Sequence, residues 1–281
     1  MPRAWRIGLT LAALAAAGVA VSLALGSRAI APWELARVLF APDGSVNAQI
    51  VHELRLPRVL AAFGTGGLLA IAGALMQVLL RNPLADPYVM GASGGAAVGA
   101  LGAMLLGAGG LLIQGGAFGG ALASTALVFA LARREFAGAS LADPGTGAPR
   151  LLLAGVMLAA WPLGRALNVL LRGPLIAQAL GVRVQGLRRL LFVLASLATA
   201  VAVTTSGAVG FVGLVVPHAL RLAIGNDQRV LLPACALAGG TLLVLADSVA
   251  RTVVAPQQLP VGLVTALLGV PSFLVLLLGR R

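Results

Sequence analysis

The sequence contains no lysine, one cysteine and two histidines, and all 20 of its basic residues are arginine. A P-loop needs its lysine to hold nucleotide phosphates, so the absence of lysine excludes a Walker-type ATPase site on this chain. The single cysteine, Cys235, cannot build a disulfide framework or a thiolate metal cluster. His52 and His218 add neither a nucleophile–base pair nor a multi-ligand metal centre. We therefore predict no catalytic residue and no bound metal or cofactor.

Charged side chains are too scarce to cover a water-exposed surface. They occupy 10% of the 281 positions, hydrophobic residues occupy 59%, and the mean hydropathy is +1.01. Lipid is therefore the expected solvent for most of the chain. A membrane-spanning helix needs about 20 apolar residues, so the length accommodates roughly nine or ten spans. We predict one all-α transmembrane domain over residues 1–281, without a soluble catalytic domain.

The net charge of +12 and the pI near 11.9 raise the question of nucleic-acid binding. The arginines, however, occur singly or in pairs at the ends of apolar runs. This pattern is typical of loops that anchor membrane helices, and it does not form a phosphate-binding face. We predict no nucleic-acid partner.

Nine apolar windows follow one another along the chain. They cover residues 7–25, 59–80, 89–113, 115–132, 151–171, 190–206, 208–224, 230–250 and 259–279. The first is longer than the core of a typical signal peptide, and we interpret it as the first span. Several windows are rich in glycine and alanine, which allow helix backbones to approach closely in lipid. The windows therefore predict a tightly packed helical bundle.

The distribution of arginine predicts that both termini are cytoplasmic, because Arg3 and Arg6 precede the first window and Arg280 and Arg281 follow the last. Two inside ends require an even number of crossings, yet nine windows are present. The same rule places both flanks of residues 151–171 inside, although a straight helix of that length spans about 31 Å, one crossing. A re-entrant hairpin centred on residues 161–162, or a missing piece of sequence, would explain the mismatch.

Three ordered motifs carry more specific information than hydropathy. The first comprises LRLPR at 54–58, GALMQ at 73–77 and RNPLADP at 81–87; the second is GAVGFVGLVVPH at 207–218, followed by Arg221 and DQR at 227–229; the third comprises LAD at 245–247, Arg251 and LPVGLVTA at 259–266. Together they closely resemble the permease subunit of type II ATP-binding-cassette importers, the FecCD/BtuC-like family. The resemblance runs along nearly the whole chain.

This resemblance implies a polytopic bundle of ten spans per subunit in the bacterial inner membrane, working as a homodimer. Two ATPase subunits would dock on the cytoplasmic side and use ATP and Mg²⁺ there, and a periplasmic binding protein would dock outside. Family members take up iron–siderophores, haem or cobalamin. We expect an iron chelate, because iron chelates are the commonest cargo in the family.

The resemblance also assigns roles to particular residues. Arg55, Arg58 and Arg251 match arginines that pair with carboxylates of the binding protein, a task suited to the planar guanidinium fork; plain anchoring of helix ends is the alternative. The segment AQALGVR at 177–183 matches cytoplasmic coupling helices that sit in a groove of the ATPase; a simple amphipathic connector is the alternative. The predicted coupling residues are Ala177, Gln178, Leu180, Gly181, Val182 and Arg183. The family has Gly-Glu just before this segment, whereas this chain has Gly173, Pro174, Leu175 and Ile176.

The remaining motif residues are interpreted as structural: Pro57, Gln77, Arg81, Asn82, Pro83, Asp86, Pro87, Pro217, His218, Asp247, Pro260 and Gly262. The prolines of the 81–87 loop favour a rigid turn. His218 has no second ligand nearby and is interpreted as a helix-end residue. Asp247 lies within an apolar window, where an acid is costly. Arg251 follows at i+4, which predicts an ion pair between the two.

Compared with the family, the outer halves of the fifth and sixth spans, and the loop between them, are missing around residues 151–171. We therefore expect a truncated hairpin there, and a transport-impaired permease is one alternative. A secondary transporter driven by an ion gradient is a second, but it predicts several intramembrane acids or broken helices, and only Asp247 is available. A membrane-embedded enzyme would need a catalytic constellation that the two histidines and one cysteine do not supply.

Overall fold

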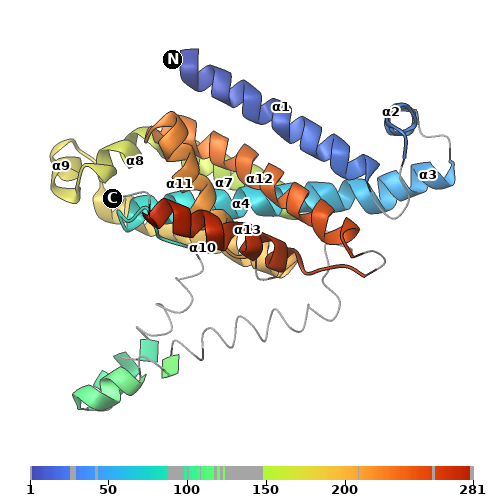
Figure 1. The fold of residues 1–281 in the computed structure, drawn as a ribbon. Helices are drawn as coiled ribbons and strands as arrows, with labels where there is room; N and C mark the ends of the chain where they lie inside the picture. The colour runs from blue at the N-terminus through green and yellow to red at the C-terminus, as the bar shows by residue number, and fades with distance from the viewer. Residues whose placement is uncertain are drawn as a thin grey trace.

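The computed structural model describes residues 2–25, 30–41, 44–87, 98–99, 101–107, 109–116, 119–120, 123, 148–207, 209–254 and 257–278. Every regular element in these ranges is a helix (Figure 1). The helices are α1 (Pro2–Ala24), α2 (Pro32–Phe40), α3 (Val46–Gln49), the π-helix η1 (Ile50–Arg55), α4 (Leu56–Leu79), α7 (Ala148–Ala160), the 3₁₀ turn η2 (Trp161–Leu163), α8 (Gly164–Leu171), α9 (Pro174–Ala179), α10 (Val184–Ser206), α11 (Val212–Ile224), α12 (Gln228–Thr252) and α13 (Val261–Leu278).

Five of these helical runs are long and apolar enough to cross a membrane: Arg6–Ala24, Val46–Leu79, Pro149–Leu171, Val184–Val203 and Gln228–Thr252. Two shorter apolar helices, Val212–Ile224 and Val261–Val275, accompany them. The all-helical membrane bundle predicted from hydropathy is confirmed for the described residues. Window 89–113 lies only partly within them, and window 115–132 falls largely outside them.

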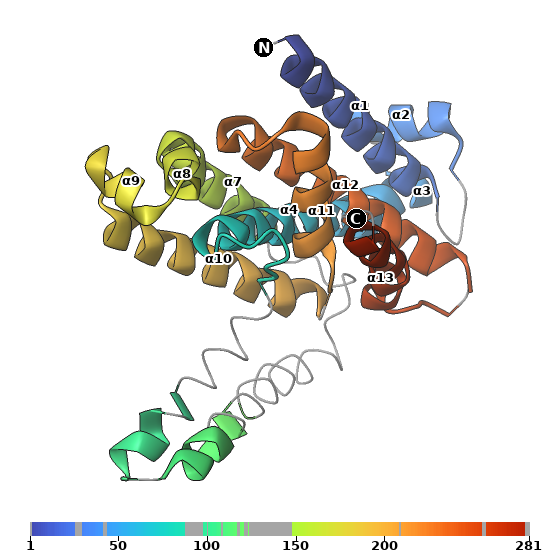
Figure 2. The ribbon, with the colours of Figure 1, turned by 60° about the vertical axis from the view of Figure 1, so that its left-hand side comes forward.

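Helix α4 is the centre of the bundle, and α7, α10, α11 and α12 surround it (Figures 1 and 2). Nearly all of its residues from Val59 to Val78 are buried. Glycine permits this crowding: a Cβ at Gly66 would overlap the Gly239 carbonyl on α12, and a Cβ at Gly73 would overlap the Gly213 carbonyl on α11. The small residues of the predicted packing thus lie at the helix crossings, where lipid-embedded helices need them.

The contacts between helices fix their directions. Helix α12 runs antiparallel to α4, because Arg58 contacts Asp247 while Gly67 faces Ala236. Helix α1 also runs antiparallel to α4, since its last carbonyls meet Arg55. We call the end of the bundle near α2 and α3 the α2 end, and the opposite end, where α8 and α9 lie, the α9 end (Figures 1 and 2). Both described termini point towards the α9 end.

Residues 151–171 do not fold back on themselves, so the expected hairpin is not what the structure shows. Helix α7 begins beside Gly64, where Pro149 contacts α4, and the run reaches the start of α12, where Gly164 contacts Arg229. The turn Trp161–Leu163 continues the helix because its neighbours keep right-handed helical dihedrals and Pro162 occupies a first-turn position that needs no N–H donor. The segment makes one passage along the bundle.

Two other boundaries differ from the sequence prediction. The stretch between the apolar windows 151–171 and 190–206 contains α9 and the first turn and a half of α10, which begins at Val184. The stretch between the apolar windows 7–25 and 59–80 contains α2, α3 and η1, and the last two continue into α4 as one helix over Val46–Leu79. Hydropathy missed these turns because they carry polar residues and lie at the ends of the bundle.

Candidate functional site

Two arginines share one buried aspartate at the α2 end. Arg58 on α4 binds Asp247 through two hydrogen bonds: Nη2 donates to Oδ1 at 2.9 Å and Nε donates to Oδ2 at 3.1 Å. Arg251 Nε lies 3.0 Å from the second oxygen, Oδ2, one helical turn along α12. The Asp247 side chain is 1% exposed and the two arginine side chains are about 10% exposed. The predicted pair of Asp247 and Arg251 is therefore confirmed, and Arg58 joins it.

The same arginines hold the end of α1. Arg55 is buried, and its Nη1 donates to the carbonyls of Leu23 at 2.6 Å and Ala24 at 3.1 Å. Arg251 Nη2 donates to Ser22 Oγ at 2.9 Å. Cations at a helix C-terminus complement the partial negative charge of its free carbonyls. The cluster of Arg55, Arg58, Asp247 and Arg251, which we call the arginine cluster, thus joins α1, α4 and α12.

The arginine cluster combines three cationic side chains with one carboxylate, so it has an excess of positive charge. The docking role of these arginines stays a prediction, and the structure adds that each guanidinium already bonds within the subunit. The link between Arg58 and Asp247 was not predicted. The residues are 189 positions apart. Arg58 precedes one apolar window and Asp247 lies within another, so no sequence signal linked them.

The predicted coupling segment, residues 177–183 (hereafter the coupling segment), lies at the α9 end and is largely exposed. Gln178, Leu180, Gly181 and Arg183 are exposed, Val182 is half-buried, and Ala177 is buried as its anchor. Leu175 and Ile176, where the sequence departs from the family pattern, are exposed large hydrophobic residues beside it. Figure 2 shows α8 and α9 projecting at the edge of the bundle. The segment therefore presents an apolar surface at an end of the bundle, as a docking element would.

A polar clamp fixes the run α7–α8 to the start of α12. Asn168 Nδ2 donates to Asp227 Oδ1 at 2.8 Å, and Asn168 Oδ1 accepts from the backbone N–H of Gln228 at 2.8 Å. Trp161 Nε1 donates to the carbonyl of Arg229 at 3.1 Å. Asp227 is also the N-cap of α12. Hydrogen bonding from the Arg229 side chain, opposed by desolvation and helped by Asn168, lowers the pKa of Asp227 well below its ordinary value. Asn168 was not singled out from the sequence, and Trp161 was considered only as part of the centre of a possible hairpin.

The loop at 81–87 packs against α11. Gln77 is buried and its Nε2 donates to the carbonyls of Leu214 at 3.3 Å and Ala85 at 3.4 Å, joining the loop to α11. Asn82 Oδ1 accepts from the backbone N–H of Leu84, which closes a tight turn before Pro87. Pro87 would contact a Cβ placed at Gly213. The segment forms the turn that the prolines predicted, and its rigidity stays a prediction.

Most of the other motif residues lie in helices or at helix starts. Pro217 and His218 are buried in the middle of α11, so the interpretation of His218 as a helix-end residue is wrong. Pro57 lies in the first turn of α4, and Asp86 is half-buried in the loop. Pro260 and Gly262 begin α13: the Pro260 carbonyl accepts from the backbone N–H of Leu263, and the Gly262 carbonyl from Thr265 Oγ1. These contacts are consistent with structural roles.

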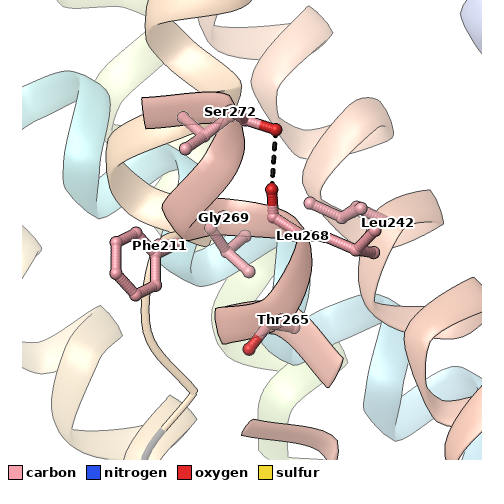
Figure 3. A pocket seen from close by; sticks show the side chains of 8 residues that line it. Phe211, Leu242, Thr265, Leu268, Gly269 and Ser272 are labelled. Carbon is pink, nitrogen blue, oxygen red and sulfur yellow. Dashed lines mark hydrogen bonds between the residues drawn. The ribbon is translucent and has the colours of Figure 1, made fainter. Parts of the chain in front are cut away.

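A small apolar pocket lies between the start of α11 and helices α12 and α13 (Figure 3). Phe211, Leu242, Leu268 and Gly269 line it, with the hydroxyls of Thr265 and Ser272 at its edge. Phe211 adopts a left-handed backbone conformation (φ 69°), and its ring lies against Gly269, where a Cβ would overlap it. The pocket volume is about 70 Å³. Small-molecule sites have about 300–1,000 Å³, so this pocket cannot hold a large cargo.

The fold is a bundle of apolar helices, several of them long enough to cross a membrane, with the arginine cluster at one end and an exposed apolar segment at the other. The model of the FecCD transport family matches residues 13–160 and 136–279. The chain belongs to the FecCD family. The two matched ranges overlap at residues 136–160. This overlap lies close to residues 151–171, where the predicted number of membrane crossings did not agree with the predicted location of the termini.

Similar proteins with known names support the same family assignment. The chain is 37% identical to the cobalamin import system permease protein BtuC of Halobacterium salinarum over 300 residues, covering 89% of this chain and 80% of the relative. It is 36% identical to the vitamin B12 import system permease protein BtuC of Escherichia coli O9:H4, covering 97% of this chain and 95% of the relative. A solved chain assigned to a metal-chelate type ABC transporter in an inward-facing conformation matches with a TM-score of 0.69 and 26% identity, over 98% of this chain and 99% of that one.

The alignment with the Escherichia coli relative contains positions that this chain lacks. It extends over 326 residues, whereas 97% of this 281-residue chain is about 273, so roughly 50 positions of the alignment have no counterpart here. The chain is a permease subunit of a type II ABC importer in the inner membrane, a class that works with separate ATPase subunits and a substrate-binding protein.

Proposed function

We propose that this chain moves a bulky metal chelate across the inner membrane, with cobalamin as the first candidate cargo. The iron–siderophore expected from the sequence remains the second candidate, because the relatives described above are named for cobalamin or vitamin B12 while the solved chain is of the metal-chelate type. The protein performs no covalent chemistry. ATP and Mg²⁺ are used on the ATPase subunits, whose closure drives the permease between its two open states.

The exposed coupling segment is the observation that carries this proposal. Leu175 and Leu180 are 79% and 62% exposed and precede Arg183 in the chain, at the end of the bundle to which both termini point. Apolar side chains presented to water are costly unless a partner covers them. An ATPase groove at the cytoplasmic surface is the partner that the family membership supports. In this proposal the α9 end and both termini are cytoplasmic, and the α2 end faces the periplasm.

The cargo path runs between two copies of the chain. The pocket beside Phe211 is too small for a chelate, and α13 next to it presents large exposed hydrophobic residues, among them Leu263, Leu267 and Leu274. In a homodimer, α13 and its partner copy would line a wider path. At the α2 end the excess positive charge of the arginine cluster favours carboxylates of a periplasmic binding protein.

Reconstitution tests the proposal. The permease, its ATPase subunit and its binding protein are placed in proteoliposomes, and uptake of cyanocobalamin and of a ferric siderophore is measured with ATP and with ion gradients dissipated by ionophores. ATP-dependent uptake that persists without gradients supports an ABC importer, and the preferred substrate assigns the cargo. Uptake that collapses with the gradient favours a secondary transporter. ATP hydrolysis without uptake of either substrate favours a transport-impaired permease.

A further inference from the structure

The coupling segment has no direct polar contact with α12 among the described residues, but the helix before it does. Asn168, near the end of α8, bonds both the side chain of Asp227 and the backbone N–H of Gln228 at 2.8 Å. The Asn168 side-chain amide therefore uses its donor, Nδ2, and its acceptor, Oδ1, on two consecutive residues at the start of α12. Asp227 in turn accepts from the Arg229 side chain at 2.7 Å. Removing Asn168 would break both links at once.

Helix α9 follows α8 through a short, fully hydrogen-bonded turn. The backbone N–H groups of Arg172 and Gly173 donate to the carbonyls of Val169 and Leu170, and the N–H of Ala177 donates back to the carbonyl of Gly173. The N–H of Val182 then donates to the carbonyl of Ala177. With so little free chain between them, α8 and the coupling segment behave as one body.

Helix α12 connects this body to the other end of the bundle. Its 25 residues span about 37 Å. Asp227 caps it at the α9 end, and Asp247, five residues before its last residue, binds Arg58 at the α2 end. The helix is buried over most of one face against α4. A displacement of α8 therefore acts on the helix that carries the acid of the arginine cluster.

We infer that Asn168 and Asp227 are positioning residues that tie the coupling segment to α12, so that the ATPase moves α12 through this clamp. The inference rests on the proposed function, since it assigns the mechanical link between the two proposed docking ends. It predicts that breaking the clamp leaves ATP hydrolysis intact while less cargo is moved per ATP.

An exchange of the two side chains tests the clamp. Asn168→Asp places two carboxylates against each other, whereas the double variant Asn168→Asp/Asp227→Asn again offers one amide and one carboxylate. We expect Asn168→Asp to lower cyanocobalamin uptake per ATP about two- to thirtyfold, the range of coupling changes seen for single residues. The exchanged double variant should restore it. Asn226→Ala is the matched control, because Asn226 is exposed and its side chain bonds only Gln228 of its own turn among the contacts that the described residues show.

Hydrogen exchange of residues 174–183 in the assembled complex gives a readout that needs no transport. We expect faster exchange in Asn168→Asp and wild-type exchange in the double variant. If Asn168→Asp does not assemble, Asn168→Ala, which removes the bonds without adding charge, takes its place. Unchanged uptake per ATP and unchanged exchange in the single variant, or failure of the double variant to restore both, overturns the inference. If the wild-type complex transports nothing, the proposed function fails, and hydrogen exchange alone still decides whether the clamp holds α9.

Discussion

Arg58 and Asp247 lie 189 positions apart in the chain, yet their charged groups meet at 2.9 Å at the α2 end of the bundle. The contact joins the first turn of α4 to the last turns of α12, and Arg251 completes it from the other side. Because Asp247 is buried, its charge is stabilised by the two arginines and not by water. The contact thus unites the two arginines of different motifs in one cluster.

Replacing Asp247 should destabilise the protein more than replacing either arginine. Asp247→Asn leaves Arg58 and Arg251 buried without their counter-charge, which costs about 3–5 kcal/mol in buried pairs. Arg58→Gln and Arg251→Gln each leave Asp247 with one arginine and should cost less. Thermal unfolding of the three variants in nanodiscs measures which of them lowers the melting temperature most. Equal melting temperatures for Asp247→Asn and the wild type would show that the cluster does not stabilise the bundle.

A methyl group at Gly73 should be far more damaging than one at Gly8. The Cβ of Gly73→Ala would overlap the Gly213 carbonyl oxygen, so α4 and α11 must separate, whereas a Cβ at Gly8 meets nothing within 4 Å. In an exposed helix, alanine is about 1 kcal/mol more favourable than glycine. We expect Gly73→Ala to reduce the yield of monodisperse protein on size-exclusion chromatography and Gly8→Ala to leave it unchanged. Equal yields for both would contradict the close packing of α4 and α11.

A charge at Leu180 should weaken binding of the ATPase without unfolding the permease. Leu180 is 62% exposed, so Leu180→Asp disturbs few internal contacts, but it removes a leucine from the proposed interface. Burial of a leucine contributes about 1.5–3 kcal/mol, which corresponds to about a ten- to hundredfold loss of affinity. Binding of the purified ATPase to the permease in nanodiscs measures this loss of affinity. Leu54→Asp, at a leucine 59% exposed at the α2 end, is the control and should bind normally.

The contribution of Asp227 to stability should be independent of pH until the solution is acidic. Hydrogen bonding from Arg229 lowers the pKa of Asp227, so the folded protein retains the charged form to a lower pH than the unfolded chain does. The stabilisation is therefore fully present above the ordinary pKa of about 3.9 and is lost as pH falls through the lowered value. The difference in melting temperature between the wild type and Asp227→Asn should stay constant from about pH 8 to pH 5 and shrink below. A difference that shrinks near neutral pH would contradict the assignment.

Much of the fold could be predicted because its causes are local in the chain. The apolar windows placed α1, α4, α12 and α13 within a few residues, and the spacing of Asp247 and Arg251 predicted their ion pair. Residues 151–171 could not be predicted in this way. Arginine counting required a return to the same side, but packing against α4 and α12 holds the segment as one run, because Trp161–Leu163 continues the helix.

The sequence by itself determined the solvent, the helical class and the family, since hydropathy, the absence of lysine and three ordered motifs are properties of the chain read in one dimension. Only the tertiary structure decided which distant side chains meet: Arg58 with Asp247, Asn168 with Asp227, and Gly73 with Gly213. The physical reason is that a buried charge or a close backbone approach depends on which helix faces touch. Packing in three dimensions sets those faces, and spacing along the chain does not.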